Sequence, residues 1–292
     1  MDGARAIERL ITRKPEADVL AAAAKMLDTG RDLPTCVAAL LAFKILAKEP
    51  RTVTVEECAA LEESAAKILA PELAMPEIGV MGVDDRKECA SRILAVLGTP
   101  RATETLVKLV QAKSPYAAAL HDMRHGDVPQ LVLGLVTPGA DHFATMPIAR
   151  ALGGCAEGRA ELRALLDPKS PFSWKEYGPA KGAALTALTN KFQELEDLKA
   201  IESVLQQRPG MLDPIHTTLP YSKKTPEQAE AVVAFLAEHE GAKIEDALLL
   251  ALALLPQELG ADAVTKLEAA RPGARERVEA KRKAWDEQRN RR

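Results

Sequence analysis

Apolar residues recur at helical spacing along most of the chain, and the pattern is clearest over residues 85–113. Side chains three and four positions apart share one face of an α-helix, so a stripe with that spacing predicts a helix with one buried side. Two such stripes occur here: Ala90, Ile93, Leu94 and Leu97, followed by Ala102, Leu106, Leu109 and Val110. Because only a short turn separates them, they predict an antiparallel helical hairpin.

The ends of this hairpin carry residues that cap helices. Asp85 followed by Glu88 has the spacing of a capping box, in which side-chain oxygens accept hydrogen bonds from backbone N–H groups. Elsewhere in the chain, Thr54 with Glu57 and Thr225 with Gln228 predict two more capping boxes. Gly98 can adopt the left-handed conformation that closes a helix, and Thr99-Pro100 can begin the next one. A single hairpin leaves the outer face of each helix uncovered, so we expect this unit to stack on others.

Looser stripes predict helices through the rest of the chain. They cover residues 4–14, 15–29, 34–48, 54–70, 114–125, 127–136, 141–153, 157–167, 179–192, 194–207, 225–236 and 244–255, and two more helices follow, the last from about residue 273. In the third helix we expect Val37, Leu40, Leu41 and Ile45 to face inward. Residues 244–255 are apolar on nearly all sides, which predicts a deeply buried helix.

Residues 71–83 interrupt the pattern with two prolines and two glycines, so we expect a loop and a seam there. The sequence therefore predicts three parts. An N-terminal helical bundle or first repeats occupy residues 1–75, and a helical repeat array occupies residues 84–272. A basic segment, residues 273–292, either caps the array or forms an arm.

The composition is that of closely packed helices. The chain of 292 residues is 47% hydrophobic but only 3% aromatic, so its core must consist mainly of alanine, leucine and valine. Such small, helix-favouring side chains suit helix packing better than sheets. The formal net charge of −3 excludes a strong overall attraction to polyanions and leaves only local patches for such partners.

The four cysteines, Cys36, Cys58, Cys89 and Cys155, are far apart and include no Cys-x-x-Cys pair. Isolated cysteines of this kind are typical of small buried residues in a reducing compartment. The N-terminus lacks the apolar centre of a signal peptide, and the longest strongly apolar run, residues 247–257, is too short to cross a bilayer. We therefore expect a cytoplasmic protein without a membrane span.

Two stretches resemble bacterial HEAT-like (armadillo-type) helical repeats. One is residues 85–115, and the other is residues 149–188, with Ala-Arg-Ala-Leu-Gly at its start and Lys-Ser-Pro at 169–171. The Asp-x-x-Val-Arg opening of the second HEAT helix is missing from most units. The resemblance implies an all-α fold, an irregular HEAT-like α-solenoid of stacked antiparallel hairpins. It also implies an interaction scaffold, although a few such proteins bind nucleic acid or are lyases.

His121 and His125 lie one turn apart on a predicted helix, so both imidazoles could bind one metal ion. Asp122, Asp127, Asp141 or His142 could supply a third ligand. The alternative is that the histidines interact with the carbonyl end of the helix. Neither a His-Glu-x-x-His motif nor a Cys-x-x-Cys pair accompanies them, and we expect no cofactor.

Cys155 follows two glycines and precedes a predicted helix, whose dipole could lower the pKa of the thiol. It is either a reactive cysteine or a small buried residue in a turn, and no partner histidine is evident. The sequence contains no phosphate-binding glycine loop, dinucleotide fingerprint or nucleophile elbow.

Phe172, Trp174 and Tyr177 concentrate aromatic side chains in a chain that has few of them. Aromatic residues in partly exposed turns often anchor a partner, so the three are candidate binding residues. The alternative is that they fill a wide gap in an alanine-rich core.

The charge changes sign near the C-terminus. Residues 225–270 carry a net charge of −7, with nine acidic and two basic residues, and residues 273–292 carry +4, with eight basic and four acidic residues. Adjacent blocks of opposite sign predict that the last helix either docks on the acidic region or serves as an arm for an acidic partner. We take Arg282, Lys283, Trp285 and Arg289 as candidate binding residues, and expect Trp285 to pack on the preceding helices.

These patterns predict a non-enzymatic protein–protein interaction scaffold, whose partner is another protein bound on one face of the solenoid. Two alternatives stay open. The first is a protein that binds the nucleic-acid backbone through its basic C-terminal segment, and the second is a metal-dependent enzyme at His121 and His125.

Overall fold

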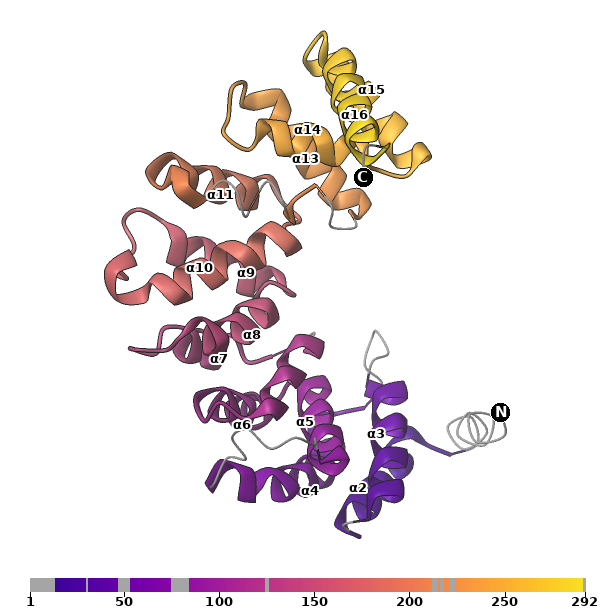
Figure 1. Cartoon of the computed structure of the whole chain (residues 1–292). Helices are drawn as coiled ribbons and strands as arrows, with labels where there is room; N and C mark the ends of the chain where they lie inside the picture. Colours follow the sequence, from indigo (N-terminus) through magenta and orange to yellow (C-terminus); the bar gives the residue numbers. More distant parts are fainter. Residues whose placement is uncertain are drawn as a thin grey trace. The chain divides into compact units, whose positions relative to one another are not determined.

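The computed structural model describes residues 14–29, 31–46, 53–74, 84–123, 126–211, 215, 218–220 and 224–290, without the side chains of residues 121 and 122 (Figure 1). Every regular element in these ranges is a helix, which confirms the all-α class. Contacts between residues divide the chain into two compact units, Met1–Gly158 and Arg159–Arg292. Each unit is described by itself.

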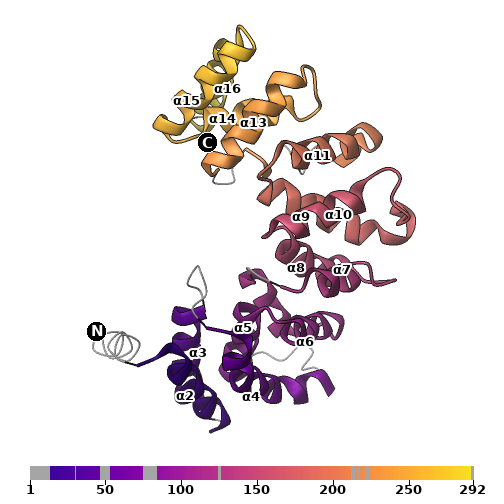
Figure 2. The same ribbon diagram turned by 180° about the vertical axis from the view of Figure 1, so that it is seen from behind.

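The first unit is built from short helices that pack on their neighbours and on the helix two places along the chain. Its elements are α2 (Glu16–Asp28), α3 (Asp32–Leu46), α4 (Val55–Ala74), α5 (Asp85–Leu97), α6 (Pro100–Gln111), the 3₁₀-helix η1 (Pro115–Asp122), α7 (Val128–Leu135) and α8 (His142–Leu152). Thus α2 contacts α3 and α4, α3 contacts α5, α4 contacts α6, and α6 contacts α8. Figure 1 and Figure 2 show α2 beside α3 from opposite sides.

The predicted hairpin is formed by α5 and α6, and most of its local signals are confirmed. Both predicted stripes are buried. Gly98 ends α5 with a φ of 61°, and the Thr99 side chain accepts a hydrogen bond from Ala102 N, with Pro100 at the first helical position. The N-cap is Asp84 rather than Asp85, because the extended backbone of Asp84 lets its carboxylate accept from Arg86 N at 2.9 Å.

Two predictions about α3 and α4 are wrong. Leu40 is 52% exposed, because the buried face of α3 is instead formed by residues such as Ala38, Ala42 and Ile45. The helix is apolar on almost all sides, so the pattern could not select the buried face. The predicted break at Pro71 is also absent, since α4 runs through it to Ala74. The rest of the predicted seam, residues 75–83, lies outside the described residues, and the predicted domain boundaries stay predictions.

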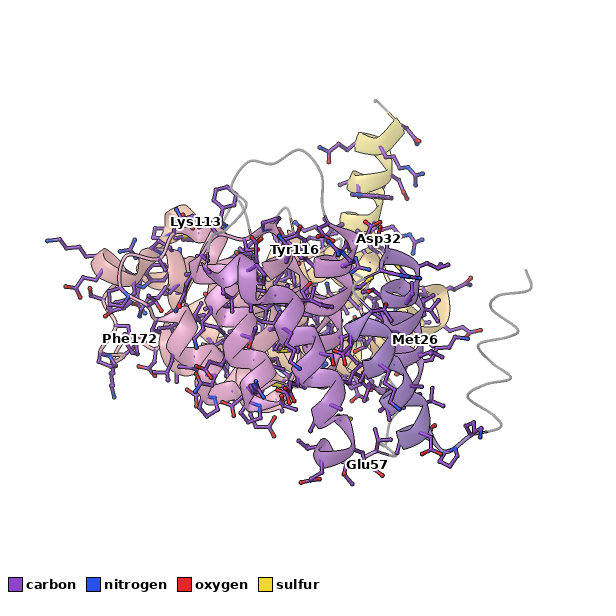
Figure 3. All side chains as sticks on the ribbon, turned by 90° about the horizontal axis from the view of Figure 1, so that it is seen from below. Met26, Asp32, Glu57, Lys113, Tyr116 and Phe172 are labelled. Carbon is purple, nitrogen blue, oxygen red and sulfur yellow. The ribbon has the colours of Figure 1, made fainter. Side chains whose placement is uncertain are left out.

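The segment after Ser114 is a 3₁₀-helix instead of the predicted α-helix. The Ser114 hydroxyl accepts from Tyr116 N, and the Tyr116 hydroxyl in turn accepts from Asp84 N at 2.9 Å. Figure 3 labels Tyr116, whose ring is buried. The figure also labels Glu57, whose carboxylate accepts from Thr54 N while Thr54 Oγ1 accepts from Glu57 N, so the capping box predicted there is confirmed.

The second unit continues with helices of similar length. After α9 (Ala156–Leu166), which crosses the division between the units, they are α10 (Trp174–Lys191), α11 (Leu195–Gln207), the 3₁₀-helix η2 (Pro209–Met211), α13 (Pro226–Glu238), α14 (Glu245–Ala253), α15 (Gln257–Ala270) and α16 (Ala274–Asn290). Helix α11 contacts α13, α13 contacts α15, and α14 contacts α16. Helix α14 is buried on almost all sides, and the capping box at Thr225 and Gln228 is present; both predictions are confirmed.

Candidate functional site

The predicted aromatic group lies at the start of α10. The helix begins at Trp174, earlier than the predicted residue 179, and is kinked at Tyr177, whose φ of −115° and ψ of 26° are not helical. Its N-cap is Ser173, which accepts from Glu176 N. The rings of Phe172 and Tyr177 meet edge to face with centroids 4.9 Å apart. Phe172, labelled in Figure 3, is half-buried.

The third aromatic residue, Trp174, faces two cations instead of the other two rings. Arg208 Cζ lies 4.6 Å and Lys181 Nζ 5.6 Å from the centroid of the indole. Trp174 and Lys181 are seven residues apart on α10, which places them on one helix face. Arg208 is the C-cap of α11, and α11 packs on α10. The structure therefore joins an aromatic ring, a buried lysine and an exposed arginine.

Lys181 is the unusual member of this group, because only 3% of the residue is exposed. Burial lowers the pKa of its ammonium; Asp167 opposes this shift and the positive charge of Arg208 adds to it. We define the basic–aromatic cluster as Trp174, Lys181 and Arg208. Sequence reasoning found only Trp174. The spacing of seven to Lys181 could have drawn attention to the lysine, whereas Arg208 belongs to another helix.

The basic C-terminal helix, α16, packs on α14 and α15. Ala274 and Val278 are buried, whereas Trp285 is only half-buried and has the Arg289 guanidinium 5.5 Å from its ring centroid. Two basic residues of α16 form ion pairs with the acidic start of α14: Arg277 with Glu245 at 2.6 Å and Lys281 with Asp246 at 2.9 Å. None of the ion pairs within the described ranges involves Arg282, Lys283 or Arg289.

Glu245 is the centre of the attachment of α16. It is buried, receives a hydrogen bond from Gly241 N at 2.7 Å, and pairs with both Arg271 and Arg277. Burial by itself would raise the pKa of this carboxyl, but the Gly241 N–H and the two guanidinium groups outweigh it and hold the pKa below its usual value. The carboxylate therefore stays charged at neutral pH and ties three segments together.

An apolar groove in the first unit was not predicted from the sequence. It has a volume of about 230 Å³ and lies between the end of α6, η1 and the start of α8, with a lining of Val110, Ala117, Phe143 and Pro147 among others. Phe143 is 86% exposed. An ion pair of 3.0 Å between Lys113 and Asp141 connects the two sides. Figure 3 labels Lys113, which projects from the helices.

The large exposed hydrophobic residues of the described chain all belong to the first unit. They are Leu33, Leu40, Val55, Leu133 and Phe143. Leu33 and Leu40 are seven residues apart on α3, so they share its outer face. Exposed apolar patches on folded proteins often mark sites of protein–protein contact.

The structure gives little support to the other sites considered. His121 lies in η1, but its side chain and all of His125 lie outside the described residues. Within the described ranges, no group of three or more potential metal-binding side chains occurs. Cys155 is half-buried, and its sulfur accepts a hydrogen bond from Gly158 N at 3.4 Å, so it acts as a cap at the start of α9.

Two of the remaining cysteines lie close together. The sulfurs of Cys36 on α3 and Cys89 on α5 are 3.8 Å apart, and burial raises the pKa of Cys89 to about 12. A thiol with so high a pKa is a poor nucleophile at neutral pH.

The described helices include none that is both long and apolar enough to span a bilayer. Comparisons of the chain with protein-family models, with curated proteins and with solved structures found no match.

Proposed function

We propose that the chain is a non-enzymatic protein–protein interaction scaffold of the cytoplasm, built as an irregular HEAT-like stack of antiparallel hairpins. The partner is another protein, which inserts an apolar side chain into the groove beside Phe143. The exposed apolar surface of the first unit carries this proposal. One set of observations supports the stacking of the hairpins, and another supports the position of the binding surface.

Several helices pack on the helix two places along the chain, such as α2 on α4, α4 on α6 and α11 on α13, and this supports the stacking, because successive hairpins of a repeat array make such contacts. Hydrogen bonds between residues about one hairpin apart add to this support. Thr99 Oγ1 donates to Glu62 at 2.7 Å across 37 residues, and Gln228 Nε2 donates to the Phe192 carbonyl at 2.8 Å across 36. These spacings fall within the usual length of helical hairpin repeats.

The groove supports protein binding because it combines an open apolar lining with a bulky, largely exposed ring. Phe143 is the most exposed large hydrophobic residue of the described chain. Burying such a ring in water-free contact contributes about 1.5–3 kcal/mol, so it makes a suitable interface anchor. The Lys113–Asp141 pair at the rim offers polar contacts around that anchor.

A photo-crosslinking experiment tests this proposal. A benzoylphenylalanine placed at position 143 should crosslink one partner in cells of the source organism, and the purified partner should then bind the unmodified protein with saturation in calorimetry. We expect Phe143→Ser to weaken that binding about tenfold or more. Val55→Ser, at an exposed hydrophobic position of the same unit outside the groove, is the matched control and should leave the affinity unchanged.

Equal affinity of the wild type and Phe143→Ser would refute the groove as the binding site. Crosslinks between two copies of this chain, with dimers in sedimentation that Phe143→Ser abolishes, would replace the scaffold by a self-association surface. Circular dichroism of the variant excludes loss of fold as the cause.

The nucleic-acid alternative is favoured by one observation, the exposed positions of Arg282, Lys283 and Arg289. Against it, Arg277 and Lys281 already neutralise acidic residues of α14. Binding of a DNA or RNA fragment that falls steeply with salt, and that is lost in a variant with Arg282, Lys283 and Arg289 changed to glutamine, would favour this alternative.

A further inference from the structure

The charged side chains that are buried in the described chain have partners, with one exception. Hydrogen bonds or ion pairs satisfy Glu62, Glu72, Lys87, Arg159, Asp197, Glu202 and Glu245. Lys181 is equally buried, yet no hydrogen bond or ion pair reaches it among the described residues. The stem of Lys181 is covered, and its ammonium receives no acceptor from the described chain, so this position suits an anion that comes from solution.

A second cation approaches the same place. Arg208 and Lys181 both lie against the ring of Trp174, and their charges repel each other. The nearest acidic group, Asp167, is occupied by its own turn, where it accepts from Lys169 N at 2.6 Å. The basic–aromatic cluster therefore holds two positive charges and an apolar wall without a carboxylate bonded to either cation.

Solvent reaches this cluster. Arg208 is exposed and Trp174 is half-buried. The Nζ atom of Lys181 is itself accessible to solvent, although the rest of the side chain is covered. A small anion can therefore contact the lysine beside the indole without opening the core.

We infer that Trp174, Lys181 and Arg208 form a binding site for a doubly charged oxyanion of the phosphate type. A dianion can compensate both cations, whereas a single carboxylate would leave one of them unbalanced. Arginine binds two oxygens of a phosphate at once, and lysine adds a point charge. The phosphate is either free in solution or part of a phosphate monoester on a larger molecule, and this site is independent of the groove at Phe143.

The two tryptophans allow a direct test. In a Trp285→Phe protein, Trp174 is the only indole, so its fluorescence reports on the cluster. Titration with inorganic phosphate, and separately with phenyl phosphate, at constant ionic strength should give a saturable change in emission. The ligand with the lower Kd identifies the source: inorganic phosphate indicates a free anion, and phenyl phosphate indicates a monoester.

Two substitutions and a control make the test specific. Lys181→Met should abolish saturation, and Arg208→Gln should weaken binding about tenfold, as expected for the loss of one charged hydrogen-bonding group. Lys181→Arg keeps the charge and should retain binding. Lys175→Met removes an exposed charge from the same helix and should have no effect.

Loss of fold can be separated from loss of the site. Circular dichroism and the melting temperature of each variant establish that it is folded, and removal of an unpaired buried charge should not destabilise the helix. No saturable response in the Trp285→Phe protein with either ligand would overturn the inference. So would a response in folded Lys181→Met equal to that of the parent.

Discussion

Different kinds of polar interaction hold the hairpins together in the two units. In the second unit the ties are largely ionic: Arg159 and Arg163 of α9 pair with Asp197 at the start of α11, and Arg271 and Arg277 pair with Glu245. In the first unit hydroxyl groups form several of the buried ties. They include Thr99 with Glu62, Thr103 with Asp127 N, and Tyr116 with Asp84 N, alongside one buried ion pair between Lys87 and Glu72.

The surfaces of the units differ as well, since the large exposed hydrophobic residues of the described chain occur only in the first. A core of alanine and leucine fits many helix positions about equally well, so directional polar bonds are needed to fix which hairpin meets which. The comparison indicates that charged residues of the second unit serve to fix which of its helices pack together. The first unit carries the exposed apolar side chains to which we assign partner binding in the proposed function.

The largest effect is expected at the ionic tie between α9 and α11. The Asp197 side chain is fully buried, and that of Arg159 is 3% exposed with its Nε 3.2 Å from the carboxylate. Asp197→Ala leaves a buried guanidinium without its main partner and should lower the free energy of unfolding by about 3–5 kcal/mol. Urea denaturation measures the loss.

The exposed pair between Asp262 and Lys266 is the matched control, with atoms 2.9 Å apart but both side chains at least half exposed. Asp262→Ala should change the unfolding free energy by less than about 0.5 kcal/mol. A cost for Asp197→Ala no greater than that of the control would contradict the structural role of the buried α9–α11 ion pair in the second unit.

Two glycines test how closely the helices approach. A Cβ at Gly158 would lie 2.2 Å from the Leu152 carbonyl oxygen, so Gly158→Ala must displace backbone and should destabilise the protein by about 2–3 kcal/mol. Gly182, inside α10, has open space around it, and Gly182→Ala should stabilise by about 0.5–1 kcal/mol. Thermal unfolding of the two variants should shift in opposite directions, and a shift of the same sign would show that one environment is misassigned.

Two lysines that are wholly or partly buried give a comparison that depends on pH. Lys87 of the first unit faces the Glu72 carboxylate, whereas Lys224 of the second donates to the neutral carbonyl of Leu219 at 2.5 Å. Burial lowers the pKa of Lys224 to about 8, from 10.5 in the unfolded chain. Between these values the unfolded chain binds more protons, so stability should rise with pH by about 3 kcal/mol in that window.

Urea unfolding at a series of pH values measures this rise. The unfolding free energy of the Lys224→Met variant should change less with pH over the same range, because the titrating group is gone. An identical slope in Lys224→Met would assign the effect to other groups.

The structural features that could be predicted from the sequence depend on interactions between residues a few positions apart. The capping boxes at Thr54 and Thr225, the glycine end at Gly98 and the start at Thr99 depend on neighbours three or four positions away, and all are present. The one-residue shift of the N-cap to Asp84 came from two adjacent aspartates that fit the same motif. Local capping rules cannot choose between such neighbours.

The contacts between hairpins could not be predicted in this way. Glu202 accepts from Lys243 N and Ile244 N, 41 and 42 residues ahead, and nothing around Glu202 in the sequence marks it for that role. The same limit applies to the candidate site. The rarity of aromatic residues revealed Trp174, and Lys181 shares its helix face, but Arg208 joins them only through the packing of α10 on α11. The groove at Phe143 likewise depends on how α8 meets η1.

The smallest expected effect concerns the salt bridge that joins α16 to α14. Arg277 is 42% exposed and Arg271 only 13%, although both guanidinium groups contact the Glu245 carboxylate. Solvent screens the first pair more strongly, so Arg277→Ala should lower stability by only about 0.5 kcal/mol at low salt and by less at about 0.5 M NaCl. Arg271→Ala should cost more and depend less on salt, because it uncovers a buried carboxylate and also removes the bond to the Leu236 carbonyl. Melting temperatures at both salt concentrations separate the two cases. If Arg277→Ala proved the more costly and showed no salt dependence, α16 would be held mainly by this residue, and the order of importance drawn from burial would be reversed.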